Sequence, residues 1–598
     1  MCGFIAAVGS SPTPIEMTGL KRVLGQMHRR GPDAEGIRQE PGVKLRHRRV
    51  AIHDMAARSK QPMHSNCRRY VIVFNRAIYS PYALRSERIL KGVQFHTTSD
   101  RKSCWPLFAL EGAAMLVRLR GMFAFVIWDR TTRHAFAARE PYGIKPLYWA
   151  QTKYGVLLGS QEKALLATGL VDRSPCARGQ VSFWLLGSVS EPHTWYESIK
   201  ALQAGHYMWI DYCRMGQPQR WWEVAEAWRN ALAALPSLVE VRERARTALR
   251  ESVKAHLVAD MPVGVFLSGG IDSGALAALM VEAGAQNLQR ITLTFDEFAG
   301  ASNDEAPLAA TLARHYGIAN TVRRVTRAEF MADLPRILAV MDQPTVDGIN
   351  TWYATKAVAE LGPKVVVSGV GGDELFQGYS SFRDLPRLVS ARRIANRMPG
   401  LIALSRAAPG WQARRSGNAR SQHLPDWAQP IAGAWWLRRG LFAPSDLPAL
   451  MGKDLVNQGL PRFSPDVWVH DMCGALSTNP FLALGQIEST TYVLNQLLHD
   501  SDWATMDHSV ELRTPWVDAW LLRDLQQLLS ALSQFPNKSL LAEAPDKPLP
   551  EALVNWRKSG FGIPVQTWLK QMGIARLDHS PSGAWAVEVA HRYSGVGA

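Results

Sequence analysis

The segment Ser268-Gly269-Gly270-Ile271-Asp272-Ser273 has the residue types of a phosphate-binding loop. It follows an apolar run and precedes a helix-prone stretch. The two glycines allow the backbone to approach an anion closely, and successive N–H groups at the start of a helix donate to it. Ser268 and Ser273 add hydroxyl donors. Asp272 suits Mg²⁺ better than phosphate. The segment therefore predicts a phosphate site with a metal ligand beside it.

No Gly-Lys-Ser/Thr follows the loop, so it is not a Walker A motif. Its shape is instead typical of enzymes that split ATP into AMP and pyrophosphate. A second Gly-rich loop, Ser368-Gly369-Val370-Gly371-Gly372-Asp373-Glu374, also follows an apolar run. Loops at the carboxyl ends of parallel strands meet at one edge of a sheet. We therefore expect Asp373 to share a Mg²⁺ ion with Asp272.

Two kinds of element must position these loops. Before residue 210, short β-prone runs separated by turns predict a sheet-rich domain. After residue 239, apolar runs alternate with helical patterns, which predicts a parallel sheet. The sequence character changes between them. We expect a first domain at 1–215, a linker at 216–238 and a second domain at 239–598.

The composition limits the class of protein. The chain has 598 residues, 47% hydrophobic and 20% charged, as expected for a globular protein rather than a disordered one. No apolar run approaches the roughly 18 residues of a spanning helix. Six cysteines without a C-x-x-C pair argue against a disulfide framework or a zinc site. With no signal-peptide pattern at the start, the cytoplasm is the expected compartment. The net charge of +16 permits nucleic-acid binding but does not establish it.

Several motifs, in order along nearly the whole chain, make the sequence resemble the glutamine-dependent asparagine synthetases. The two loops above are part of this pattern. The other matching stretches are Met1-Cys2-Gly3-Phe4-Ile5, Arg30-Gly31-Pro32-Asp33, Gln61-Pro62-Met63, Phe74-Asn75, Gly143-Ile144-Lys145-Pro146-Leu147-Tyr148, Asp342-Gln343-Pro344, Ser509-Val510-Glu511-Leu512-Arg513-Thr514-Pro515 and Arg557-Lys558-Ser559-Gly560-Phe561.

The resemblance implies an α/β protein with two active sites. The first domain would have the four-layer α/β/β/α fold of the N-terminal-nucleophile amidotransferases and would hydrolyse glutamine. The second would have an adenine-nucleotide α-hydrolase-like parallel sheet and would adenylate a carboxylate, first of all the aspartate side chain. Ammonia would pass internally and displace AMP. The implied cofactors are ATP and Mg²⁺, the partners are small molecules, and a homodimer is expected.

The resemblance also assigns residues in the first domain. Cys2 would be the nucleophile. Removal of Met1 would free an α-amine with a pKa near ~7.7–8.0, which can act as the local base. Asn75 would donate to the oxyanion. Arg49 would bind the glutamine α-carboxylate, and Asp100 would bind its α-ammonium group.

In the second domain, Lys558 would face the charge that develops on the adenylate and pyrophosphate. Glu511 could orient substrate or a neighbouring base, or it could be the internal partner of Arg513; the sequence leaves both open. Asp272 and Asp373 would hold Mg²⁺. The nucleotide and pyrophosphate site would comprise Leu267, Ser268, Gly269, Gly270, Asp272, Ser273, Leu293, Ser368 and Gly369.

The sequence departs from the family pattern at both sites. Asn75-Arg76-Ala77 stands where the family has Asn-Gly-Glu, and Ser99-Asp100-Arg101-Lys102 stands where it has Ser-Asp-Thr-Glu. The added cations predict a weakened glutaminase, with free ammonia as the working nitrogen source. Val370 occupies a position where several relatives have Glu or Tyr, and valine performs no acid–base chemistry.

Val370 leaves the acceptor open, so a uronic acid in a polysaccharide precursor or a natural-product peptide is an alternative to aspartate. A different class, an RNA-adenylating enzyme, would use the basic charge, but it would not need the Cys-Gly domain, and no RNA-binding motif is present. The intact ATP motifs argue against a pseudoenzyme that only binds partners. Residues 390–480 carry no motif with an interpretable chemistry.

Overall fold

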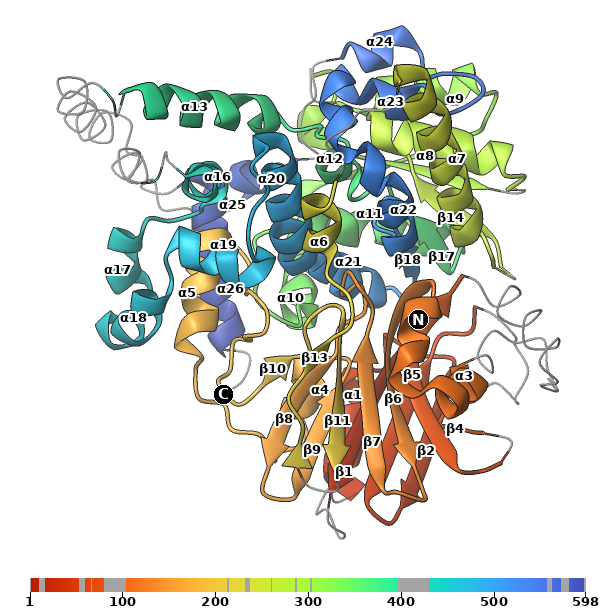
Figure 1. Cartoon of the computed structure of the whole chain (residues 1–598), viewed down its shortest axis with the longest axis vertical. Helices are drawn as coiled ribbons and strands as arrows, with labels where there is room; N and C mark the ends of the chain where they lie inside the picture. Colours follow the sequence, from red (N-terminus) through yellow and green to blue (C-terminus); the bar gives the residue numbers. More distant parts are fainter. Residues whose placement is uncertain are drawn as a thin grey trace.

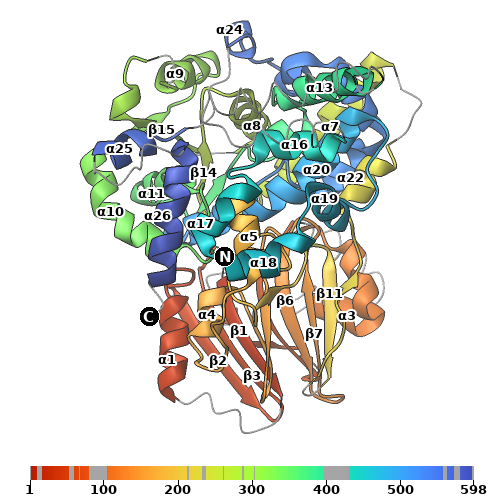
Figure 2. The same cartoon turned by 90° about the vertical axis from the view of Figure 1, so that its left-hand side faces the viewer.

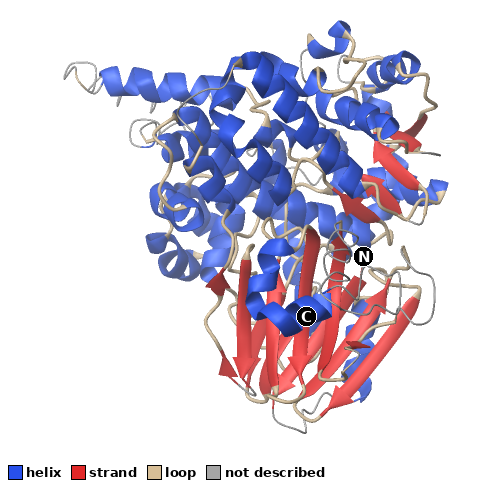
Figure 3. Ribbon diagram, turned by 45° about the vertical axis from the view of Figure 1, so that its right-hand side comes forward, coloured by secondary structure: helices blue, strands red, loops and turns tan. Residues whose placement is uncertain are grey.

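The computed structural model describes residues 2–9, 17–52, 60–65, 67–79, 104–211, 214–231, 237–259, 261–285, 288–301, 304–395, 397, 427, 430–556, 562–571 and 580–595. Figure 1 shows strands gathered in the part of the molecule that carries the N-terminal half of the chain, and helices in the rest. Figure 3 shows the same division by colour.

Two antiparallel sheets form the N-terminal half. The first has the strand order β10-β8-β9-β1-β3-β2, and the second has the order β12-β11-β7-β6-β5-β4, with β13 paired to β11. The first sheet comprises β1 (Cys2–Gly9), β2 (Ala34–Glu40), β3 (Val43–Arg49), β8 (Tyr148–Thr152), β9 (Gly155–Gly159) and β10 (Lys200–Ala201). The second comprises β4 (Met63–His64), β5 (Tyr70–Ile78), β6 (Gly121–Asp129), β7 (His134–Arg139), β11 (His206–Asp211), β12 (Arg214–Met215) and β13 (Gln219–Arg220).

Alternating side chains explain why the central strands are apolar throughout. Phe4 and Ala6 of β1 face the second sheet and pack in one cluster with Val73 of β5. Ile5 and Ala7 point the other way and pack near α1 (Met17–Gln26) and α4 (Glu162–Leu166). Figure 2 shows these helices on one side of the paired sheets and α3 (Cys104–Glu111) on the other. The α/β/β/α prediction is confirmed.

A parallel sheet with the order β16-β15-β14-β17-β18 forms the centre of the C-terminal half, as predicted. Its strands are β14 (Val263–Phe266), β15 (Gln289–Phe295), β16 (Thr321–Val325), β17 (Val365–Val367) and β18 (Glu511–Arg513). In the parallel pairing of β14 with β17, Val265 lies opposite Val367. Both strands therefore end at the same level, and the two Gly-rich loops leave the same edge of the sheet.

Helices surround this sheet on both faces. Those before the second loop are α6 (Val224–Arg229), α7 (Leu238–His256), α8 (Ile271–Glu282), α9 (Ala306–His315), α10 (Arg327–Val340) and α11 (Ile349–Leu361). Those after it are α12 (Gly372–Leu375), α13 (Ser381–Ala395), α16 (Ile431–Arg439), α17 (Leu447–Met451), α18 (Lys453–Gly459), α19 (Pro465–Cys473), α20 (Pro480–Ile487), the π-helix η8 (Glu488–Leu498), α21 (His499–Met506), α22 (Ala519–Leu525), α23 (Ser539–Ala542), α24 (Glu551–Val554), α25 (Val565–Gln571) and α26 (Pro581–Gly595).

The described part of residues 390–480, a segment without a chemical motif, contributes to core packing. Trp435, Trp436 and Trp468 lie buried in one cluster with residues of α5 (Ala177–Leu186). Trp436 meets Trp468 edge-on, with ring centroids 5.7 Å apart. Such aromatic pairs stabilise a core beyond the area that they bury. The segment thus joins α5, which precedes residue 215, to the helical half of the chain.

Buried ion pairs join the two halves. The Asp502 carboxylate of α21 accepts two hydrogen bonds from the Arg30 guanidinium, at 2.6 and 3.1 Å. Lys145 Nζ lies 3.8 Å from the same carboxylate. All three side chains are buried. A buried charge is tolerated only when it is paired and hydrogen-bonded, so these contacts fix the position of α21 against the N-terminal half.

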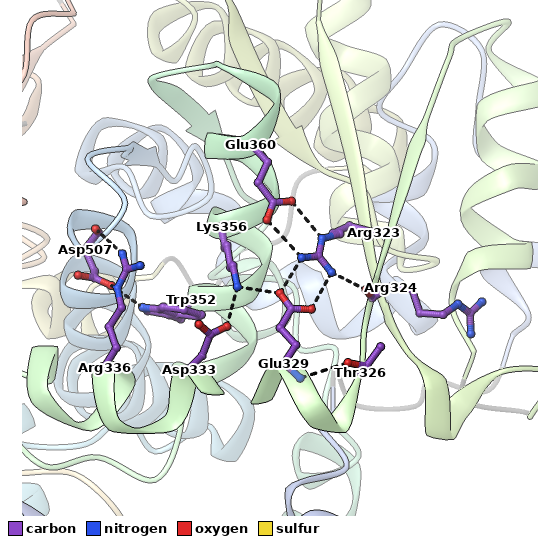
Figure 4. Close-up of polar contacts among 10 residues, drawn as sticks. All are labelled: Arg323, Arg324, Thr326, Glu329, Asp333, Arg336, Trp352, Lys356, Glu360 and Asp507. Atoms are coloured by element: carbon purple, nitrogen blue, oxygen red, sulfur yellow. Dashed lines mark hydrogen bonds and ion pairs between the residues drawn. The ribbon is translucent and has the colours of Figure 1, made fainter. Parts of the chain in front are cut away.

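A second carboxylate, Asp507, extends this interface. It accepts hydrogen bonds from Arg29 (3.1 Å), from Arg336 Nε (2.7 Å) and from Trp352 Nε1 (2.9 Å). Figure 4 shows Arg336 and Trp352 around Asp507, and beside them Lys356 between Glu329 and Asp333. Arg29 belongs to the N-terminal half, whereas Arg336 and Trp352 belong to the other.

We expect Asp502→Asn to lower the free energy of unfolding by about 3 kcal/mol at neutral pH, because it leaves two buried cations poorly compensated. Burial raises the pKa of Asp502, but Arg30 and Lys145 outweigh this effect and hold that pKa below its usual range. The stabilisation is therefore complete above about pH 4 and is lost as the pH falls through the lower folded-state pKa. Urea unfolding of both proteins between pH 3 and pH 7 measures this difference.

The matched control is Asp296→Asn, which removes a carboxylate 3.8 Å from Arg324 in an exposed pair and should change stability by less than about 1 kcal/mol. Equal effects of the two substitutions, or an effect of Asp502→Asn that persists unchanged at pH 3, would contradict the assigned role of Asp502.

Candidate active sites

Cys2 and Asn75 meet between the two sheets of the N-terminal half. Cys2 is the first residue of β1, and its side chain is buried. Its backbone N–H donates to Asn75 Oδ1 at 3.2 Å. The contact joins β1 of one sheet to β5 of the other, so the fold brings together two residues that are 73 positions apart.

The amide nitrogen of Asn75 is available as a donor. Asn75 is fully buried, and its Nδ2 has no hydrogen-bond partner among the described residues. A buried N–H₂ group without an acceptor is costly unless a ligand satisfies it. Because Oδ1 is engaged by Cys2, Nδ2 is oriented as expected for a donor to an oxyanion.

Arg76 lies on the opposite face of β5 from Asn75. Successive side chains of a strand alternate, so Arg76 shares a face with Phe74, and its guanidinium carbon lies 4.2 Å from the Phe74 ring centroid. The long cation is therefore directed away from Cys2. This placement removes one physical reason for the expected weakening of the glutaminase. Asp100, Arg101 and Lys102 lie outside the described residues.

Arg49 lies directly across from Cys2 in the β1–β3 pairing and is buried. Gly31 packs against the same stretch. A Cβ atom on Gly31 would lie 2.3 Å from both the Arg48 carbonyl carbon and the Arg49 nitrogen, so only glycine fits. This close approach brings the preceding residue, Arg30, next to β3, which pairs with the strand that carries Cys2.

In the second half, the Ser268 loop forms the expected turn. Gly270 N–H donates to Ser268 Oγ at 3.1 Å, and the hydroxyls of Ser268 and Ser273 are 2.8 Å apart. Helix α8 begins after Gly270, which provides no side-chain acceptor for the first N–H groups of the helix. Those N–H groups are suited to an anion such as pyrophosphate.

The predicted leucines lie at the base of this site. Leu267 and Leu293 are buried, on or directly after the neighbouring strands β14 and β15. Leu267 N–H donates to the Ile291 carbonyl at 2.8 Å. Ser368 is likewise buried directly after β17, and its N–H donates to the Arg513 carbonyl of β18. The loops therefore leave the sheet with their first backbone donors already paired.

Lys538 was not identified from the sequence, yet it joins the two predicted metal ligands. Its Nζ donates to Asp272 Oδ2 at 2.5 Å and to Asp373 Oδ1 at 2.7 Å. Burial lowers the pKa of Lys538, but the two carboxylates outweigh this effect and raise it above the usual range. No motif marks this residue; its backbone has a φ of +56°, in the left-handed region.

The carboxylates fit a metal ion. Asp272 and Asp373 converge on one position, which the ammonium group of Lys538 occupies, and hard carboxylate oxygens are what Mg²⁺ requires. Two glycines make room for them. A Cβ on Gly372 would lie 2.3 Å from Asp272 Oδ1, and one on Gly378 would lie 2.2 Å from Asp373 Oδ1.

Glu511 lies away from both loops. It is at the start of β18, opposite Val365 at the start of β17, whereas the loops leave the far ends of the strands. Its carboxylate accepts from Arg513 Nε at 2.8 Å. Of the two roles left open by the sequence, this geometry favours the ion pair. Lys558 lies outside the described residues.

Val370 packs against an apolar cluster that crosses between the two halves. From the N-terminal half this cluster includes Ala77 and Tyr79 of the β5 region, and from the C-terminal half it includes Val517. Ala77 is two residues beyond Asn75 on the same strand face. Apolar packing is therefore continuous from the neighbourhood of one site to the neighbourhood of the other.

Comparison with known proteins agrees with this geometry. A family model for a glutamine amidotransferase domain matches residues 1–222, and the asparagine synthase model matches residues 244–582. The chain belongs to the asparagine synthase family. Asparagine synthetase [glutamine-hydrolyzing] 1 of Bacillus subtilis is 28% identical over 95% of this chain and 88% of its own length. Asparagine synthetase B of Escherichia coli is 28% identical over 64% of this chain and 66% of its own.

The family and the class of enzyme predicted from the sequence are confirmed. The enzyme is an ATP-dependent ligase with a glutamine amidotransferase domain. Within the described part of the chain, no helix has both the length and the apolar character needed to cross a bilayer.

We expect Gly372→Ala to weaken binding of Mg-ATP at least tenfold, because the new methyl group would displace the Asp272 carboxylate. Calorimetric titration with Mg-ATP measures this. The control is Gly25→Ala in helix α1, where a Cβ meets nothing within 4 Å. Unchanged nucleotide affinity in Gly372→Ala would contradict the placement of Asp272 in the site.

We expect Lys538→Met to lower the melting temperature in the absence of divalent cations, because two partly buried carboxylates then repel each other. Added Mg²⁺ should restore much of the loss by occupying the vacated position, by mass action. The exposed Lys453→Met is the control. If Mg²⁺ shifts the melting of wild type, Lys538→Met and the control equally, the carboxylates do not form the metal site.

Proposed function

We propose that this enzyme makes asparagine: it adenylates the side-chain carboxylate of aspartate with ATP and transfers ammonia to the activated carbonyl, releasing AMP. The observation that carries the proposal is the meeting of Asp272, Asp373 and Lys538 at the carboxyl ends of two adjacent parallel strands, beside the Ser268 loop. The named function of the Bacillus and Escherichia relatives supports aspartate as the acceptor.

In the adenylation step, a carboxylate oxygen of the acceptor attacks the α-phosphorus of ATP, and the bond to the bridging oxygen of pyrophosphate breaks. The Ser268 loop and the α8 N-terminus would donate hydrogen bonds to the leaving pyrophosphate. Asp272 and Asp373 would hold Mg²⁺, which offsets phosphate charge when bound. The Lys538 ammonium group, which lies between the two carboxylates in this structure, would have to move aside when Mg²⁺ binds there. Lys558 would face the developing negative charge.

In the glutaminase step, the Cys2 thiol adds to the side-chain carbonyl of glutamine. The α-amine freed by removal of Met1 would accept the thiol proton and pass it to the leaving ammonia. Asn75 Nδ2 would donate to the oxyanion, Arg49 would bind the α-carboxylate, and Asp100 would bind the α-ammonium group. Water then cleaves the thioester to give glutamate and free Cys2.

Ammonia would pass through the interface between the two sites. A small cavity there is lined by Tyr79 and Ile144 from the first half and by His256 and Val517 from the second. Burial lowers the pKa of His256 to about 4, so its ring is uncharged at neutral pH. The apolar side chains and the uncharged His256 ring do not stabilise NH₄⁺, whereas the acidic residues Glu140 and Asp518, which also line this cavity, would attract it.

A second candidate is amidation of a different carboxylate. Two observations favour it: Val370 provides no acid or base in the second loop, and the chain is 30% identical, over 64% of its length, to a Gibberella zeae protein named amidase chry2. The domain limits at 215 and 239, a homodimer and a cytoplasmic location stay predictions.

We expect Cys2→Ala to abolish asparagine formation with glutamine and to leave formation with ammonium within about twofold, because only the first site loses its nucleophile. Asn75→Ala should reduce the glutamine-dependent rate about 100-fold by removing an oxyanion donor. Cys67→Ala, at an exposed cysteine, is the control. The measurement is mass-spectrometric detection of asparagine with each nitrogen donor.

Persistence of glutamine-dependent synthesis in Cys2→Ala would contradict the assignment of the nucleophile. A wild-type enzyme that uses ammonium but not glutamine would contradict the proposed glutaminase step, and would instead support the weakened glutaminase expected from Ala77, Arg101 and Lys102.

A further inference from the structure

Helix α13 reaches outward from the helical half of the molecule (Figure 1). Its first half is anchored, because Phe382 and Leu385 are buried in one cluster with Trp435 of α16. Val389 is the last residue of the helix that packs against this cluster. Beyond it, no described residue of α13 belongs to a buried apolar cluster. The end of the helix therefore adds nothing to the core.

One face of α13 is basic. The helix carries four arginines against a single aspartate. Arg383, Arg387 and Arg393 are exposed, and so is Arg397 just beyond the helix. At about 100° per residue, the three exposed arginines of the helix span about 120° of its circumference. We call these three residues the arginine face.

The arginine face makes no ion pair with a described carboxylate. Exposed arginines elsewhere do make such pairs, as Arg242 does with Glu543 at 2.9 Å. One more exposed cation lies at the base of α13, where Arg438 donates to Ser380 Oγ at 3.4 Å. Cations that are gathered on one surface without carboxylates repel one another, so this surface favours an anionic partner.

An aliphatic side chain lies on the same surface. Ile394 is 62% exposed. It is eleven residues from Arg383, close to three full turns, and so points in nearly the same direction. Arg393 directly precedes it, and the exposed Arg397 follows it three residues later. An aliphatic side chain that protrudes among cations is suited to the headgroup region of a bilayer, where guanidinium groups meet lipid phosphates.

The chemistry of this surface favours a lipid over a nucleic acid. The planar guanidinium fork of arginine binds phosphate oxygens in pairs, and both partners present phosphates. Single-stranded nucleic acids are also bound through aromatic side chains on which their bases stack. The only aromatic residue of α13, Phe382, is 1% exposed, and Ile394 provides no stacking surface.

We propose that α13 docks the enzyme on the anionic surface of a phospholipid bilayer, with Arg383, Arg387 and Arg393 on lipid phosphates and Ile394 among the headgroups. The helix lies on the membrane and does not cross it, because its own apolar side chains pack into the protein core. Three cations and one aliphatic side chain give weak, reversible and salt-sensitive binding. The proposal goes beyond the proposed function and does not depend on which carboxylate the enzyme amidates.

The test is co-sedimentation of the full-length enzyme with phospholipid vesicles. One preparation contains phosphatidylcholine with about 30% phosphatidylglycerol, and the other contains phosphatidylcholine alone. We expect the enzyme to bind the anionic vesicles at about 50 mM salt, to dissociate from them at about 500 mM salt, and to leave the neutral vesicles unbound.

Substitutions on α13 should weaken this binding. Arg383→Gln/Arg387→Gln should lower the partition coefficient about 25-fold, at about fivefold per arginine. Ile394→Ser should lower it several-fold without any change in charge. The matched control is Arg242→Gln/Arg244→Gln, which removes the same charge from two exposed, paired arginines of α7 and should change binding by less than about twofold. The melting temperature of each variant checks that the chain is folded.

A wild-type enzyme that does not bind the anionic vesicles would overturn the proposal, and so would equal losses in the α13 variants and in the control. Binding to single-stranded RNA through the same arginines but without a contribution from Ile394, in an enzyme that does not bind vesicles, would assign the surface to nucleic acid and also overturn it. Ammonium-dependent asparagine formation in the absence of vesicles should be the same in every variant, so failure of this proposal leaves the proposed function intact.

Discussion

Asp502 holds two cations from the opposite half of the chain in a position that is buried from water. One of them is Arg30, which precedes Gly31. Gly31 packs against Arg49 of β3, and Arg49 lies directly opposite Cys2 of β1. Asp502 itself belongs to α21. This helix leads into β18, which pairs with β17. One buried carboxylate therefore ties the N-terminal half, close to Cys2, to the sheet that carries the second Gly-rich loop.

The parts of the synthetase site that are local in sequence could be predicted, because they follow from strand–loop–helix patterns. Parallel pairing then forces Asp272 and Asp373 to the same edge of the sheet, although they are about 100 residues apart. Lys538 could not be found in this way. It reaches Asp272 across 266 positions of the sequence, and only tertiary packing decides that contact.

Residue type alone also gave an incomplete view of Arg76. The sequence shows a cation next to Asn75, but the two-residue period of β5 places it against Phe74 on the other face. Glu511 is a similar case. Its motif suggested a place at the active site. The direction of β18 instead puts Glu511 at the end of the sheet opposite the two Gly-rich loops, where its carboxylate pairs with Arg513.

We propose that the two sites are coupled: ammonia released at the first site passes through the interior of the protein to the second. The most direct test gives wild-type enzyme glutamine labelled with heavy nitrogen in its side-chain amide, together with ATP, aspartate and a large excess of unlabelled ammonium. Mass spectrometry of the asparagine formed then reports the source of its amide. Label well above its share of the total ammonia is the predicted result. An isotopic composition equal to that of the bulk ammonium pool would contradict the account.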